Sequence, residues 1–254
     1  GGSSSSGFTL SGGSYYINTA NGFEYFAQTV RNGTDYRGKT VYLNTDINLN
    51  NISFKGIGSG STYFRGTFDG RNHTISNLKI NISEYHVGLF RNTENATIKN
   101  LKINTAGITG SRRETAVLVG FHAGTLTISD CHVTGASVTG GAVDGISLTG
   151  GFVGLSRGKL TISSSSYSGN VAASGGKHVG GLVGYTEADG AGFYNCTVGT
   201  ASARAKITIT GNNSNDIGGL LGCFGGDGTV TVNNCNVFAS EINTVGEYAG
   251  GLIG

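Results

Sequence analysis

A glycine-framed apolar run occurs six times in this chain, and the intervals between its copies restrict the possible folds. The copies are Val87-Gly88-Leu89-Phe90, Val117-Leu118-Val119-Gly120, Gly151-Phe152-Val153-Gly154, Gly181-Leu182-Val183-Gly184, Gly219-Leu220-Leu221-Gly222 and Gly251-Leu252-Ile253-Gly254. With Leu89, Leu118, Phe152, Leu182, Leu220 and Leu252 taken as equivalent, the spacings are 29, 34, 30, 38 and 32 residues. A period of this length is typical of solenoid and other repeat architectures.

An alternating stretch follows most of these runs. The clearest copies are Leu126 to Val133, Leu160 to Ser163, Phe193 to Val198 and Val230 to Val237, with apolar residues at every second position. Alternation of this kind indicates a strand with one buried face. Stacking one repeat on the next pairs each strand with its own copy. We therefore predict an all-β fold, a right-handed parallel β-helix of about eight coils that stack at roughly 4.8 Å.

The first third of the chain differs from the repeats and predicts a cap. Asn21 and Glu24 match a capping box, and Phe23, Phe26, Ala27 and Val30 follow at helical spacing. We predict a short helix over residues 22–31, lying across the open end of the coil and covering its edge. The expected organisation is a flexible linker over 1–7, the cap and first strands over 8–64, and repeats over 65–254, with cap and repeats forming a single domain.

Composition excludes several classes of partner. The net charge is only +2 and basic residues form no stripe, which argues against binding nucleic acid or an anionic membrane surface. No window has the roughly 18 consecutive apolar residues of a membrane-spanning helix, so we predict no membrane insertion. The chain ends on a repeat run at Gly254, so we expect it to be a piece of a longer protein. The unpaired edge of that last coil is a candidate surface for self-association.

The cysteines suggest packing. Cys131, Cys196 and Cys235 occupy one position in their repeats, with Ser165 in the copy between. Cys196 and Cys235 would lie in neighbouring coils, within the distance range of a disulfide, but a ladder of small buried thiols is the favoured interpretation. Cys223 follows its apolar run where other copies have Phe121, Leu155 and Tyr185, which also suggests packing.

Polar candidates for a site have simpler structural interpretations. Asp69, Gly70, Asn72 and His73 could form an acid/base or metal pair, but Asp-Gly before Asn is also a turn signal, which we favour. The single Gly225-Gly226-Asp227-Gly228 is expected to be a turn instead of a calcium site. His86, His122, His132 and His178 fall in separate repeats, and no zinc motif is present. We therefore predict no catalytic residue, no cofactor and no metal.

Three further patterns leave alternatives open. Asp130 has Ser164, Asn195 and Asn234 as counterparts, an amide and hydroxyl row where a polysaccharide-cleaving β-helix would need clustered carboxylates; loops could still supply them. Ice binding is suggested by Thr-x-Thr pairs at 125, 208 and 229, although the copies at 161 and 194 lack them. The aromatic-rich leading third could stack on sugars, but core packing is the favoured use of Tyr15, Tyr16, Tyr36, Tyr63 and Phe64. No role is assigned to the N-glycosylation sequons at Asn32, Asn51, Asn72, Asn81, Asn95, Asn195 and Asn212.

The stretch from Phe64 to Ile80, with the later Gly-Gly-Leu-Val-Gly copies, resembles the GLUG-repeat proteins. Segments 23–26, 38–41 and 43–49 resemble that family's leading segment, whereas Ala116-Val117 departs from its two glycines. The family comprises extracellular β-solenoid segments of bacterial surface proteins, among them adhesin-like proteins and non-catalytic parts of IgA-protease-type metallopeptidases. The resemblance implies a cell-surface location and no shared ligand.

The main functional hypothesis is a non-enzymatic structural or adhesive module, acting as a rigid stalk or contact surface for an unknown glycan or protein. The alternatives are a carbohydrate-active enzyme or an accessory domain of a surface peptidase. An ice-binding solenoid ranks below both.

Overall fold

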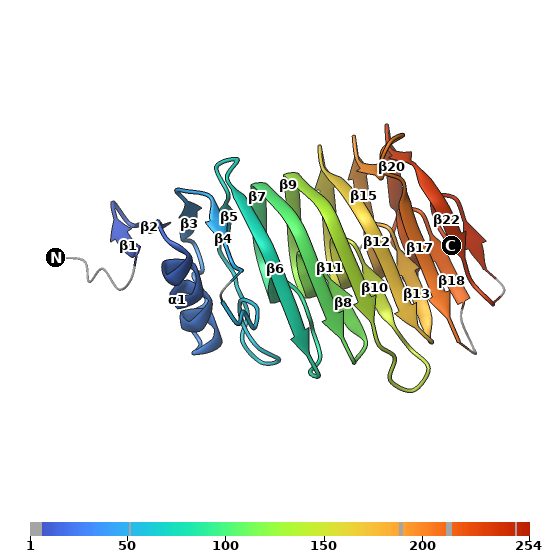
Figure 1. The fold of residues 1–254 in the computed structure, drawn as a ribbon, viewed down its shortest axis with the longest axis horizontal. Helices are drawn as coiled ribbons and strands as arrows, with labels where there is room; N and C mark the ends of the chain where they lie inside the picture. Colours follow the sequence, from blue (N-terminus) through green and yellow to red (C-terminus); the bar gives the residue numbers. More distant parts are fainter. Residues whose placement is uncertain (1–6, 51, 188–189, 212–214, 247) are drawn as a thin grey trace.

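The computed structural model describes residues 7–50, 52–187, 190–211, 215–246 and 248–254. Within them the chain winds into a parallel β-helix of about seven turns, one fewer than expected, and forms an elongated rod with the chain ends at opposite ends (Figure 1). One hydrophobic core continues from Phe8 in the cap to Leu221 near the far end. Cap and repeats therefore share a core.

Two sheets and one helix make up the fold. The main sheet contains β1 (Phe8–Ser11), β2 (Ser14–Ile17), β3 (Thr40–Leu43), β4 (Ile47–Asn48), β5 (Thr67–Asp69), β6 (Thr74–Ile82), β7 (Phe90–Gly110), β9 (Val119–Gly140), β11 (Val153–Ser163), β12 (Ser166–Ser174), β14 (Val183–Thr186), β15 (Ala191–Tyr194), β16 (Thr197–Val198), β17 (Ala205–Thr210), β19 (Leu221–Phe224), β20 (Val230–Asn233), β21 (Asn236–Val237) and β22 (Ala239–Asn243). The smaller sheet contains β8 (Glu114–Ala116), β10 (Leu148–Gly150), β13 (Lys177–Gly180), β18 (Asn215–Gly218) and β23 (Ala249–Gly250). The helix is α1 (Ala20–Arg31).

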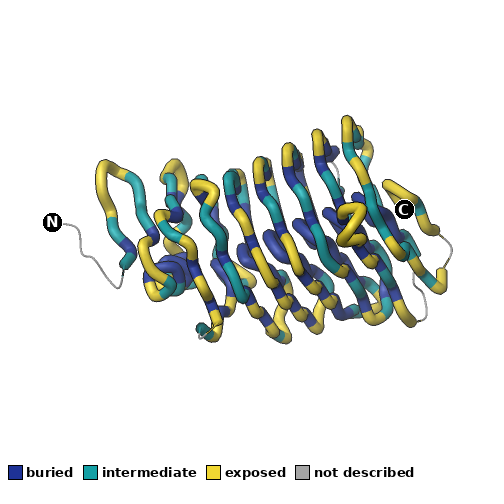
Figure 2. Tube along the Cα trace, turned by 45° about the horizontal axis from the view of Figure 1, so that its top comes forward, coloured by how far each residue is buried: buried dark blue, intermediate teal, exposed yellow. Residues whose placement is uncertain are grey.

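The register of the repeats agrees with the sequence alignment. Val119 pairs with Phe90 and Val153, and Val183 pairs with Val153 and Leu221, so the residues one position earlier are equivalent as predicted. Leu89, Leu118, Phe152, Leu182 and Leu220 are fully buried. Figure 2 shows buried and exposed segments alternating around each coil.

Leu252 does not belong to this buried ladder as expected, because 42% of its surface is exposed. It lies in the last coil that the structure describes. The preceding coil contacts it on one side, where the N–H of Leu220 donates to the Leu252 carbonyl at 2.8 Å. A ladder position is buried only when coils pack against it on both sides.

The row of Asp130, Ser164, Asn195 and Asn234 is exposed, as predicted, and it forms a corner between strands. All four residues have left-handed φ angles of 51°, 48°, 53° and 50°. Among residues other than glycine, Asn and Asp tolerate this backbone best, because their short polar side chains can bond locally. Asn234 Nδ2 also donates to Oδ1 of Asn195 in the adjacent coil at 2.7 Å. Backbone geometry thus accounts for the polar residue types.

The helix at the cap end begins two residues earlier than predicted. Its N-cap is Thr19, whose side chain accepts a hydrogen bond from Gly22 N, so the proposed capping role of Asn21 is wrong. The extended conformation of Thr19 places its hydroxyl over the first turn. The predicted apolar face is correct, since Phe23, Phe26, Ala27 and Val30 are all fully buried.

The helix covers the end of the core but does not cover the sheet edge. That edge is occupied by β1, which pairs antiparallel with β2, while β2 pairs parallel with β3. Gly7, which was assigned to the linker, accepts a hydrogen bond from Asn18 N at 2.7 Å and belongs to the fold. The rest of the predicted linker, residues 1–6, lies outside the described residues. No helix in the described part is long and apolar enough to cross a membrane.

Candidate ligand-binding groove

Glycines allow the two sheets to meet at main-chain contact on the outside of the solenoid. A Cβ atom added to Gly184 would lie 2.5 Å from Thr149 N and 2.8 Å from Gly154 O, closer than real Cβ atoms come to any neighbour. The same crowding occurs at Gly120, Gly154 and Gly222, the equivalent positions in other coils. Only glycine permits such an approach. This glycine row explains the last glycine of every repeat run except the first, which ends on Phe90.

Two rows of side chains close over the glycine row and form what we call the solenoid groove. One row belongs to the smaller sheet or the residues just before it, and the other to the strands that follow the bend. Their members are His86, Glu114, Leu148, His178 and Asp216 on one side, and Asn92, Phe121, Leu155, Tyr185 and Cys223 on the other. The rows touch: the His86 and Phe121 rings stack 4.8 Å apart, and His178 lies 4.7 Å from Tyr185.

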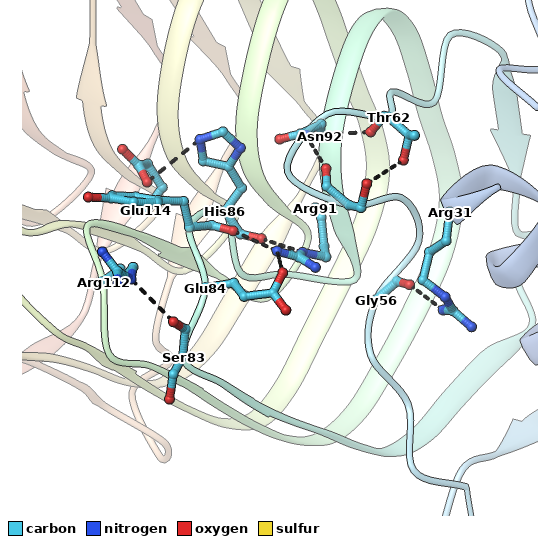
Figure 3. A network of polar contacts seen from close by, with 12 residues as sticks. Arg31, Gly56, Thr62, Ser83, Glu84, His86, Arg91, Asn92, Arg112 and Glu114 are labelled. Carbon is cyan, nitrogen blue, oxygen red and sulfur yellow. Dashed lines mark hydrogen bonds and ion pairs between the residues drawn. The ribbon is translucent and has the colours of Figure 1, made fainter. Parts of the chain in front are cut away.

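A cavity of about 450 Å³ opens at the cap end of the solenoid groove. Its lining comprises Gly60, Ser83, Glu84, Tyr85, His86, Arg91 and Arg112. Arg91 takes the place that Gly120 has in the next coil, and its guanidinium donates to Glu84 and to the carbonyls of Tyr85 and His86 at 2.8 to 3.0 Å (Figure 3). Arg112 donates to the Ser83 carbonyl at 3.2 Å. The cavity therefore forms where the glycine row ends.

A second cavity of about 270 Å³ follows along the same groove. Its lining comprises Arg113, Glu114, Ile146, Leu148, Leu155, Arg157, His178, Tyr185 and Glu187. Arg157 Nε lies 3.1 Å from Glu187 Oε2, and Arg113 donates to Asp144 Oδ2 at 3.0 Å. Apolar side chains from Leu148, Leu155 and Phe121 form a small cluster beside it, separate from the main core. The groove thus combines an apolar floor with charged walls.

His86 lines the first cavity and Glu114 lines the second, and His86 Nε2 lies 3.8 Å from Glu114 Oε2. This distance is longer than a hydrogen bond, and Figure 3 marks the contact with a dashed line. Burial lowers the pKa of His86 to about 4 and raises the pKa of Glu114. Both shifts favour the uncharged form, because burial penalises the charged one. The groove floor is therefore poorly suited to a fixed charge at this point.

Asp69 and His73 form a turn and have different partners. The backbone N–H of His73 donates to the Gly70 carbonyl at 2.8 Å, and Arg71 and Asn72 have left-handed φ angles. Asp69 lies 3.6 Å from Lys99, whereas His73 Nδ1 lies 3.1 Å from Asp46. The favoured turn interpretation thus describes the geometry. The residues Gly226 to Gly228 also form a bend, with Asp227 exposed.

The cysteine ladder matches its predicted positions, and all four cysteines are free thiols. Cys196 N donates to Cys235 Sγ at 3.4 Å, and Cys131 N donates to Ser165 Oγ at 3.1 Å. Cys223 differs from the expectation of simple packing. It lies beside His178 and Asp216, and donor atoms of all three side chains fall within 4.8 Å of one another.

The aromatic residues of the leading third divide between core and surface. Tyr36 and Phe64 are buried in the main core. Tyr16 stacks on Tyr42, and the Arg71 guanidinium lies 4.0 Å from the Tyr42 ring centre. Tyr63 contacts the apolar cluster of the groove. Two of the seven sequons, at Asn51 and Asn212, lie outside the described residues.

Comparison with solved structures supports the fold. The chain is similar to a crystal structure of a "putative immunoglobulin A1 protease" from Bacteroides ovatus, with a TM-score of 0.63 and 17% sequence identity. The alignment covers 94% of this chain and 83% of that one. At this identity the similarity establishes the β-solenoid fold alone. No protein-family model and no curated protein sequence matches the chain.

Proposed function

We propose that this chain is a non-enzymatic, extracellular module of a bacterial surface protein, whose rigid β-solenoid binds a glycan or protein in the solenoid groove. The observation that carries the proposal is the groove itself: two adjoining cavities on a face whose shape is set by the glycine row. The resemblance to GLUG-repeat proteins supports the surface location. A stack of coils with one core supports the role of stalk, because each coil is held by its neighbours.

The groove offers contacts of the kind that sugars and extended peptides use. Tyr85 is 37% exposed, and the Arg112 guanidinium lies 4.7 Å from its ring centre. Arg157 and Glu187 supply a donor and an acceptor at the wall of the second cavity. An aromatic face beside fixed polar groups provides both stacking area and orientation.

The carboxylates are engaged in the architecture, which supports a non-enzymatic role. Most described Asp and Glu side chains pair with a basic side chain, often from an adjacent coil. Cross-coil pairs include Asp35–Arg65, Asp46–His73, Asp69–Lys99, Glu94–Arg65, Asp144–Arg113, Glu187–Arg157, Asp216–His178 and Glu241–Lys206. Glycoside hydrolysis needs two carboxylates on either side of one bond, with one of them free to act as an acid.

Binding to an array of glycans and to immobilised host glycoproteins tests the proposal. We expect a ligand whose binding is lost in Tyr85→Ala and in Arg112→Ala. Tyr194→Ala is the matched control, because Tyr194 is also 37% exposed but lies outside the groove. Equal loss in the control, or binding unchanged in both groove variants, would remove the groove from the proposal.

The Bacteroides ovatus neighbour favours a second candidate, the accessory part of a surface peptidase. In both cases the module itself should be inactive. Incubation with acidic and neutral polysaccharides should release no reducing ends or unsaturated products, and incubation with immunoglobulin A should yield no fragments. Turnover that disappears in Glu114→Gln would show that the groove is an active site.

The threonine pattern gives little support to ice binding. One file of threonines, at the same position in five successive coils, runs along the rod: Thr40, Thr67, Thr97, Thr127 and Thr161. The Thr-x-Thr pairs in the sequence did not reveal this regularity. The file breaks at Gly192, and Thr125 pairs with Lys159 in the next coil. A flat ice-binding face would need a second file beside the first.

A further inference from the structure

Three side chains of different chemistry converge near the far end of the solenoid groove, in two successive coils. His178 lies on β13, Asp216 on β18 and Cys223 on β19. Because Lys177 pairs with Asn215, His178 and Asp216 are equivalent positions one coil apart. His178 Nδ1 lies 2.8 Å from Asp216 Oδ2, and donor atoms of all three groups lie within 4.8 Å of one another.

The fold holds these side chains in place. His178 and Asp216 have left-handed φ angles of 67° and 53°, as does His86 in the same row, whereas Glu114 and Leu148 do not. The ring of Tyr185 packs on one side of His178 at 4.7 Å. Tyr185 also pairs in register with Cys223. What sets this place apart from the other coils is its combination of an imidazole, a carboxylate and a thiol.

We propose that His178, Asp216 and Cys223 form a binding site for one transition-metal ion, with Zn²⁺ as the expected occupant. Imidazole nitrogen and thiolate sulfur are the ligands that zinc takes in proteins, whereas Ca²⁺ and Mg²⁺ select oxygen. Three protein ligands leave the fourth position to water or to a group of the bound ligand. On binding, the Cys223 thiol loses its proton to solvent, and its sulfur and the metal form a bond.

The geometry fits this ion after small side-chain movements. Tetrahedral coordination at zinc bond lengths places the donor atoms roughly 3.3 to 3.6 Å apart. The 2.8 Å between His178 Nδ1 and Asp216 Oδ2 must open slightly, and Cys223 Sγ already lies within 4.8 Å of both partners. All three side chains are partly exposed, so an ion can reach them from the groove.

A Cys-His-Asp nucleophile is the other use of such a trio, and the surroundings of Cys223 oppose it. Burial and the neighbouring Asp216 carboxylate raise the pKa of the Cys223 thiol to about 11. A nucleophilic cysteine needs the opposite, a cationic environment that favours the thiolate. A bound dication would supply that charge, but it would also occupy the sulfur.

Titration of the metal-free protein with Co²⁺ tests the site directly, because thiolate coordination to tetrahedral Co²⁺ produces intense charge-transfer and visible bands. We expect one equivalent to bind, and Zn²⁺ to displace it. Cys223→Ser should abolish the charge-transfer band. In Cys223→Ser, His178→Gln and Asp216→Asn, Zn²⁺ affinity should fall by more than the roughly 10- to 100-fold that loss of a contact supporting a ligand typically costs.

Cys235→Ser is the matched control, because Cys235 is another partly buried free thiol, located beside Cys196. It should bind Co²⁺ and Zn²⁺ like the parent. Zn²⁺ should also raise the melting temperature of the parent and of Cys235→Ser, but not of Cys223→Ser, since a ligand stabilises only the state that binds it. Circular dichroism checks that each variant folds. Absence of stoichiometric binding by the folded parent, or unchanged binding by Cys223→Ser, would overturn the site.

Discussion

Replacing Gly184 by alanine tests whether the two sheets meet at main-chain contact. The added methyl carbon would lie 2.5 Å from Thr149 N and 2.8 Å from Gly154 O. Ordinary contact requires about 3.4 to 4 Å, so the sheets must separate by roughly 1 Å. Overpacking of this kind costs about 1 to 3 kcal/mol, and main-chain obstacles place Gly184→Ala near the upper end. Alanine also leaves the unfolded chain less conformational freedom than glycine does, and this effect stabilises the folded protein by about 0.4 to 1 kcal/mol.

The expected net loss of stability is about 2 to 2.6 kcal/mol. At roughly 2 to 4 °C per kcal/mol for a domain of this size, the melting temperature should fall by about 4 to 10 °C. Thermal unfolding followed by far-ultraviolet circular dichroism measures it. Urea unfolding followed by tyrosine fluorescence provides a second measurement, since the chain has 11 tyrosines and no tryptophan.

Gly107→Ala is the matched control. Gly107 lies on β7, a Cβ atom there would meet nothing within 4 Å, and its φ angle is not left-handed. Its counterparts in successive coils are Ser137, Asn170 and Lys206, all of which carry side chains. The control should match or slightly exceed the parent in stability. If Gly184→Ala melts like the parent, or if both variants lose stability equally, the contact between the sheets is not as tight as described.

Three shorter predictions address the core, the pH response and the cap. Leu182→Asp should cost several kcal/mol in urea unfolding because it buries an unpaired charge, while Leu252→Asp should cost far less because Leu252 is 42% exposed. Burial lowers the pKa of His122 from 6.5 to about 4, so below pH 6.5 the unfolded state binds more protons. The parent should therefore lose stability as the pH falls from 6.5 to 4, and His122→Gln should lose less; parallel pH profiles would contradict this. Thr19→Ala should cost about 1 kcal/mol in thermal unfolding because it removes the observed N-cap. An equal or greater loss of stability in Asn21→Ala would instead support the capping role first predicted for Asn21.

The fold could be predicted because its determinants repeat. Each glycine-framed run marks one backbone position, so aligning Leu118 with Phe152 and Leu182 fixed the register of whole coils. Cys131 and Cys196 were placed correctly for the same reason. The N-cap was misassigned because Thr19 and Asn21 are both good caps, and the choice depends on where β2 ends. The exposure of Leu252 depends on what stacks against the last coil, which a repeat pattern does not contain.

The groove could not be predicted because its residues do not repeat. The positions of Asn92, Phe121, Leu155, Tyr185 and Cys223 are equivalent in space, but their side chains range from an amide to large apolar groups and a thiol. The approach of His178, Asp216 and Cys223 depends on a bend that brings residues from two coils together. The informative signal was the glycine that ends five of the six runs. Read as a site of close backbone approach, it would have marked the floor of the groove.

Parallel pairing of the coils determines how a load would pass through this molecule. Strand-to-strand hydrogen bonds run along the rod, as the stacked strands of Figure 1 indicate. A pull along the rod therefore stretches these bonds lengthwise, and every strand of a coil shares the tension at the same interface. A force that lifts a single turn sideways would instead break its bonds one after another. Such a rod should resist axial extension better than peeling, and attachment at the ends of the rod would use its stronger direction.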